Sequence, residues 1–149
     1  MMKQSGWLTL LDALTIILFL FALGVVFFFT PIEAVMGAVQ KVFYFHVAAA
    51  WAGMLGFLVG SIFAVLYLLK RGRSHDLVSV SAIEISLLFF VVSIITGSIW
   101  ARPIWNTWWT WDPRLTTSTI TVLVYAGYLM LRSGIDDPMQ RARTSAVFA

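Results

Sequence analysis

Four long apolar stretches, separated by short polar connectors, dominate the chain of 149 residues. A helix needs roughly 20 apolar residues to cross a hydrocarbon core about 30 Å thick. The stretches that meet or approach this requirement cover residues 7–29, 42–69, 77–100 and 115–131. The pattern therefore predicts an all-α fold, a polytopic helical membrane protein in which residues 1–149 form a single domain with four transmembrane helices.

The composition agrees with this prediction and excludes several kinds of protein. Hydrophobic residues make up 60% of the chain and charged residues 11%, which is too apolar for a soluble domain of this size. Because cysteine is absent, disulfides, thiolate metal sites and covalent cofactor attachment through Cys-x-x-Cys-His are excluded within these residues. The net charge of +3 comes from short basic clusters at the ends of apolar runs, so we expect no nucleic-acid partner.

Both ends of the chain carry apolar sequence. The first apolar stretch is longer than the roughly 7 to 15 residues of a signal peptide and has no clear cleavage site, so we interpret it as a span. Residues 144–149 resemble the opening of a further apolar segment. We therefore expect the sequence to be a fragment of a longer protein.

Basic residues are divided unequally between the two sides of the predicted spans, which indicates an orientation. One side holds Lys3, Lys70, Arg71, Arg73, Arg132, Arg141 and Arg143, and the other holds Lys41, Arg102 and Arg114. Cytoplasmic loops carry the excess of Lys and Arg, so the N-terminus is predicted in the cytoplasm and the protein in the cell inner membrane. Connectors 30–41 and 101–114 then share the outer face, close to His46.

His46 is an ionisable residue inside a predicted span, and such residues are functional candidates because they are costly at membrane depth. Small residues at helical spacing line its side of the helix, namely Ala49, Ala50, Gly53 and Gly60. This small-residue face admits either a neighbouring helix or a flat ligand. His46 itself is either a metal ligand, since neutral imidazole commonly binds metals, or a hydrogen-bonding partner of another helix.

The segment from Trp100 to Trp111 contains five tryptophans, more than membrane anchoring requires. If the stretch is helical and lies along the interface, Trp105, Trp108, Trp109 and Asp112 share one face and form an aromatic platform for a large flat π-system. Asp112 and Pro113 also suit the N-cap and first position of a helix. The free N–H groups of that helix start, with Arg114 nearby, can receive carboxylates.

Three strings resemble a known family: KVFYFHVAAAW at residues 41–51, TGSIWARP at 96–103 and WNTWWTWDPRLT at 105–116. The third resembles the WWD domain of haem-handling proteins in cytochrome c maturation, whose pattern is Trp-Gly-x-x-Trp-x-Trp-Asp. The whole chain resembles the CcmC, or haem exporter protein C, family. Asn106 stands in place of the glycine of the pattern and Pro113 in place of a common alanine, and we expect Asn106 to tolerate the turn.

The resemblance implies a multi-pass inner-membrane protein that is not an enzyme and that acts in cytochrome c-type biogenesis. It would hold haem b non-covalently at the periplasmic face and present it to the haem chaperone CcmE, together with the ABC transporter subunits CcmA and CcmB and with CcmD. By resemblance, His46 is an axial ligand of the haem iron. The cofactor-binding residues implied or predicted beside it are Trp105, Trp108, Trp109, Trp111, Asp112 and Arg114.

Family members usually have six spans and a second ligand histidine on a later outer loop, so this chain supplies one axial ligand. His75 cannot replace the second ligand, because its predicted place is across the membrane, on the order of 30 Å away. Glu84, inside the third span, is either functional or simply protonated or paired.

The alternative functions are a b-type haem electron-transfer membrane anchor, a sugar-binding transporter or receptor, and a protein-docking scaffold. The first usually needs two histidines at similar depth. The second leaves His46 without a role.

Overall fold

The structure is a computed structural model that describes residues 6–149. Its helices are α1 (Gly6–Gly24), a π-helical turn η1 (Val25–Phe29), α2 (Gln40–Lys70), α3 (Arg73–Trp105), α4 (Pro113–Ser133) and α5 (Pro138–Phe148). No strand occurs among these residues, which confirms the predicted all-α class. Lys3, counted among the basic residues of one side, lies outside the described part of the chain.

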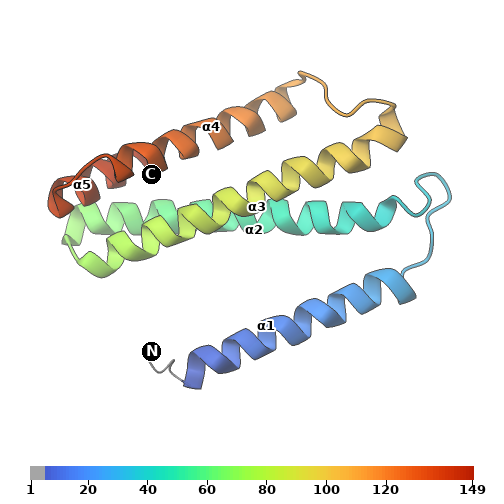
Figure 1. The fold of residues 1–149 in the computed structure, drawn as a ribbon, viewed down its shortest axis with the longest axis horizontal. Coiled ribbons are helices and arrows are strands. Elements are labelled where there is room, and N and C mark those ends of the chain that lie inside the picture. The colour runs from blue at the N-terminus through green and yellow to red at the C-terminus, as the bar shows by residue number, and fades with distance from the viewer. Residues whose placement is uncertain (1–5) are drawn as a thin grey trace.

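Helices α2 and α3 form the centre of the molecule as a long antiparallel hairpin, with α4 along one side of it (Figure 1). The connectors 30–39 and 106–112 both lie at one end of this hairpin, and α5 lies at the other end (Figure 1). His46 and the tryptophan segment therefore share one end of the bundle, as the topology argument predicted.

The small-residue face of α2 packs against the backbone of α3. A Cβ atom added to Gly53 would lie 3.1 Å from the carbonyl oxygen of Ser86, and one added to Gly60 would lie 2.7 Å from Cγ1 of Ile83. Ile83 and Ser86 are both completely buried. Of the two interpretations left open by the sequence, a neighbouring helix, and not a flat ligand, occupies the Gly53–Gly60 part of this face.

Enlarging Gly60 is expected to force α2 and α3 apart. Gly60→Leu should lower the free energy of unfolding by about 1–3 kcal/mol, the usual cost of overpacking a close contact, measured by thermal or denaturant unfolding in detergent. Gly127→Leu is the matched control, because nothing lies within 4 Å of a Cβ at Gly127. Equal stability of the two variants would contradict the packing described for Gly60.

Within residues 6–149, three helical segments are long and apolar enough to cross a membrane: Gly6–Phe29, Gln40–Lys70 and Arg73–Trp105. They correspond to the first three predicted spans and fit a multi-pass membrane protein. Helix α4 covers the fourth predicted span, but its first half is rich in threonine and it falls outside this group. A fourth crossing is therefore a proposal.

Helix α1 packs against none of the other α-helices described, and none of its residues is buried. At the other end of the chain, α5 begins at Pro138. The helix begins there because Asp137 accepts a hydrogen bond from the backbone N–H of Gln140 at 2.6 Å, with Pro138 at the first helical position.

Candidate functional site

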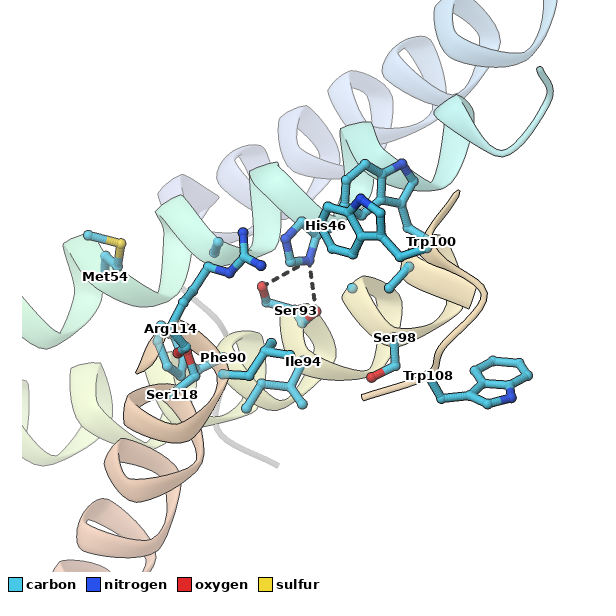
Figure 2. A pocket seen from close by; sticks show the side chains of 15 residues that line it. His46, Met54, Phe90, Ser93, Ile94, Ser98, Trp100, Trp108, Arg114 and Ser118 are labelled. Carbon is cyan, nitrogen blue, oxygen red and sulfur yellow. Dashed lines mark hydrogen bonds between the residues drawn. The ribbon is translucent and has the colours of Figure 1, made fainter. Parts of the chain in front are cut away.

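A pocket of about 320 Å³ lies between α2, α3 and the start of α4, near the end of the bundle that carries the connectors 30–39 and 106–112. We call it the His46 pocket. Its lining includes His46, Met54, Phe90, Ser93, Gly97, Trp100, Trp105, Trp108, Arg114 and Ser118 (Figure 2). The walls are mainly apolar and aromatic, with few polar groups among them.

The orientation of His46 is set by the backbone of α3. Its Nδ1 lies 2.8 Å from the carbonyl oxygen of Ser93 and 3.3 Å from the Ser93 hydroxyl (Figure 2). A carbonyl oxygen can only accept, so Nδ1 carries the proton and donates it to Ser93. The lone pair of the neutral imidazole is then on Nε2, the arrangement typical of metal-binding histidines whose other nitrogen is held by a carbonyl.

Gly97 leaves the space that the imidazole ring occupies. A Cβ at this position would lie 2.8 Å from Cε1 and 3.0 Å from Nδ1 of His46. On the α2 side, the Phe43 ring lies 6.3 Å from the imidazole, centroid to centroid. The ring is thus packed against α3 as well as hydrogen-bonded to it.

The tryptophan segment is not one continuous helix, so the predicted single-faced platform is wrong. Helix α3 ends at Trp105, and Asn106 follows in the left-handed conformation with φ 55° and ψ 23°. The Arg102 guanidinium stabilises this end, because its Nη1 lies 2.5 Å from both the carbonyl oxygen and Oδ1 of Asn106. Residues 107–112 are then non-helical up to Pro113. The expectation that Asn106 tolerates the turn is confirmed.

Four of the five tryptophans of this segment form two separate pairs. Trp100 and Trp105 meet edge to face with ring centroids 4.9 Å apart, and Trp109 and Trp111 do so at 5.6 Å. Trp105 and Trp108 line the His46 pocket, whereas Trp109 and Trp111 do not. Figure 2 shows the indole of Trp108 pointing away from His46. The structure therefore brings only part of the predicted aromatic set to the pocket.

Asp112 caps α4, as its position before Pro113 predicted. Its Oδ1 accepts from the backbone N–H of Leu115 at 3.1 Å, and its Oδ2 accepts from the Thr110 hydroxyl at 2.7 Å. The hydrogen bond from Thr110 is the largest cause that holds the pKa of Asp112 below its ordinary value, and the hydrogen bond from Leu115 is the next. The nearby charge of Arg114 lowers this pKa further. Asp112 positions the start of α4 but does not line the pocket.

Among the residues that the structure describes, Arg114 is the only Lys, Arg, Asp or Glu that lines the His46 pocket. Its guanidinium carbon lies 5.5 Å from the centroid of the Trp105 ring, and its Nη2 lies 3.7 Å from Asp112. Figure 2 shows the side chain extending from α4 toward His46. A cation at this place can pair with a carboxylate of a ligand whose flat part lies against the aromatic walls.

Several lining residues were not proposed as site residues from the sequence, among them Ser93, Gly97 and Trp100. Ser93 and Gly97 are four residues apart, so they share one face of α3, but no single-sequence signal connects that face with His46. Trp100 was visible as the first member of the aromatic run. His75, the other histidine of the chain, lies at the start of α3, at the opposite end of the hairpin.

Comparison with known proteins assigns the chain to a family. The family model described as "CcmC: Heme exporter protein C" matches residues 1–149. The chain belongs to this family. The resemblance inferred from the three sequence strings is therefore confirmed.

Relatives named heme exporter protein C support the same assignment. The Rhodobacter capsulatus protein is 37% identical over 121 residues, which is 81% of this chain and 50% of the relative. The Bradyrhizobium diazoefficiens protein is 38% identical over 117 residues, which is 78% of this chain and 44% of the relative. The Escherichia coli protein is 29% identical over 121 residues, which is 81% of this chain and 49% of the relative. The chain spans about half the length of the curated relatives it matches.

Proposed function

We propose that this chain carries part of a haem-binding site at the periplasmic face of the inner membrane and presents haem to the chaperone CcmE during c-type cytochrome biogenesis. The observation that carries the proposal is the hydrogen bond from His46 Nδ1 to the Ser93 carbonyl, 2.8 Å long, beside an aromatic pocket. It leaves Nε2 free to bind the iron of haem as cargo.

The residues of the pocket fit haem in three respects. His46 supplies a neutral imidazole, Trp100 and Trp105 supply aromatic surface, and Arg114 supplies a cation for a propionate. Trp109, Trp111 and Asp112 complete the proposed cofactor-binding set by shaping the connector. At about 320 Å³ the pocket is at the small end of the roughly 300–1,000 Å³ range of ligand sites. Partial enclosure suits a cargo that has to be released.

The second axial ligand would come from outside the described residues, either from a further part of the protein or from another chain. The proposed partners are CcmE, the transporter subunits CcmA and CcmB, and CcmD. The proposed orientation places the N-terminus in the cytoplasm, with α4 as the fourth span. A b-type electron-transfer anchor is less well supported, because His46 and His75 lie at opposite ends of the hairpin.

Titrating the purified chain in detergent with haem tests the proposal. Binding through His46 should shift and sharpen the Soret band, and addition of the apo-chaperone should then remove haem from the chain. A Soret spectrum unchanged from that of haem in detergent alone would contradict the proposal. Reversible reduction without any transfer to the chaperone would favour the electron-transfer alternative.

Gly97→Ala is expected to weaken haem binding roughly tenfold, within the 10–100-fold range seen when a group that orients a metal ligand is disturbed. The added methyl group would displace the imidazole, since it would lie 2.8 Å from Cε1 of His46. The measurement is the haem dissociation constant from the Soret titration. Gly127→Ala, made where a Cβ meets no neighbour, is the matched control and should leave the constant unchanged. Equal affinities of the two variants would contradict the role of Gly97.

A further inference from the structure

We propose that the end of the bundle opposite the His46 pocket binds the phosphate headgroup of an anionic phospholipid. The binding place consists of two cavities of about 400 and 520 Å³ that share the lining residues Tyr67, Arg71 and Met139. We call them together the basic cavity. It lies where α2 ends, α3 begins and α5 packs against both of these helices (Figure 1). This inference does not depend on the proposed haem function.

Arginines from α3, α4 and α5, and from the residue that follows α2, line the basic cavity. The lining contains Arg71, Arg73, Arg132, Arg141 and Arg143. Two carboxylates are also present, but both are engaged. Asp76 pairs with Arg132 through contacts of 2.7 and 2.8 Å, and Asp137 caps α5.

The other arginines of the cavity have no carboxylate partner among residues 6–149, where the ion pairs are Arg132 with Asp76 and Arg114 with Asp112. Four guanidinium groups thus line the basic cavity without an ion-paired carboxylate, and the lining carries more positive than negative charge. Guanidinium groups recognise phosphate oxygens through paired N–H donors. A concave surface lined by several of them therefore suits a phosphate group.

The backbone at Arg71 also indicates a binding role. Arg71 adopts a left-handed conformation, with φ 56° and ψ 20°, at the C-cap of α2. Glycine or asparagine is usual at such a position, and the adjacent Gly72 has φ −79° instead. This conformation places the Arg71 guanidinium 5.8 Å from the ring centroid of Tyr67, at the edge shared by both cavities.

The apolar lining of the cavity distinguishes a lipid from free phosphate. Met139 is 75% exposed and Leu77 is 50% exposed, so both offer apolar surface beside the arginines. The basic cavity is at the ends of two helices long enough to cross a membrane, which is the level of lipid headgroups. Basic pockets between transmembrane helices bind anionic headgroups in this way. Basic residues that only set the orientation of a protein in the membrane need not line a common cavity, as these arginines do.

Native mass spectrometry of the purified chain in neutral detergent tests the proposal. The lipids added are phosphatidylglycerol or phosphatidylcholine, and inorganic phosphate is added in a separate arm. The wild type should retain phosphatidylglycerol in preference to phosphatidylcholine. The variant Arg71→Gln with Arg141→Gln should bind it about 25-fold more weakly, at about fivefold for each arginine. Lys70→Gln removes one positive charge beside the cavity but not from its lining, and should change binding less than about twofold, against about fivefold for each lining arginine.

Three results would overturn the proposal. They are an absence of preference for phosphatidylglycerol, an equal loss in the Lys70→Gln and double variants, and displacement of the lipid by inorganic phosphate. If the double glutamine variant loses helicity by circular dichroism, Arg71→Lys with Arg141→Lys decides the matter. That variant keeps the charge but loses paired donors, so it should bind phosphatidylglycerol more weakly than Lys70→Gln does.

Discussion

Replacing His46 with alanine is expected to weaken haem binding by the purified chain at least about 100-fold, more than the loss of a merely orienting group. The reason is that His46 is the only histidine in the pocket, and its Nε2 is the nitrogen left free by the hydrogen bond to Ser93. The remaining aromatic walls and Arg114 would hold the macrocycle without an iron ligand. The measurement is the Soret titration in detergent.

His75→Ala is the control for this experiment, because it removes the other histidine of the chain, at the opposite end of the hairpin. It should bind haem as the wild type does, with an unchanged Soret maximum. If His46→Ala binds as tightly as His75→Ala, the pocket does not supply an iron ligand and the haem proposal fails at its central step.

Breaking the ion pair between Asp76 and Arg132 is expected to have the largest effect on stability. The two guanidinium nitrogens lie 2.7 and 2.8 Å from the two carboxylate oxygens, and each side chain is 13% exposed. Asp76→Ala would leave the Arg132 charge nearly buried without its partner. We expect a loss of roughly 2–3 kcal/mol in the free energy of unfolding, somewhat below the value for a fully buried pair. Denaturant unfolding in detergent measures it.

A double-mutant cycle separates the pair from the loss of charge in general. Asp76→Leu combined with Arg132→Met should recover most of the lost stability, because two apolar side chains leave no unpaired charge. Asp136→Ala removes an exposed carboxylate that forms no ion pair among residues 6–149, and should change stability little. A loss in Asp136→Ala equal to that in Asp76→Ala would contradict the explanation.

Local sequence signals predicted the helical class, the first three spans and the start of α4. Three apolar runs of sufficient length became the segments Gly6–Phe29, Gln40–Lys70 and Arg73–Trp105, because the number of apolar residues sets the length of a membrane-spanning helix. Asp112 and Pro113 began α4, since capping depends only on neighbouring backbone groups. Such features need no knowledge of the rest of the fold.

The aromatic platform was predicted incorrectly because α3 ends inside the tryptophan segment instead of continuing through it. A helical period places Trp105, Trp108 and Trp109 on one face, but the left-handed Asn106, held by Arg102, ends α3 before that face forms. The residue before a proline is also disfavoured in a helix, and Asp112, just before Pro113, is extended with φ −70° and ψ 161°. Helical periodicity alone does not reveal where a helix stops.

The sequence by itself determined that His46 and the tryptophans lie at one end of an apolar helical protein and that the chain belongs to the heme exporter protein C family. Only the tertiary structure decided what surrounds His46. Ser93 and Gly97 are 47 and 51 residues away along the chain, and they reach the imidazole because the glycine face of α2 lets α3 pack closely. A contact of this kind depends on the register of two helices, which no local pattern specifies.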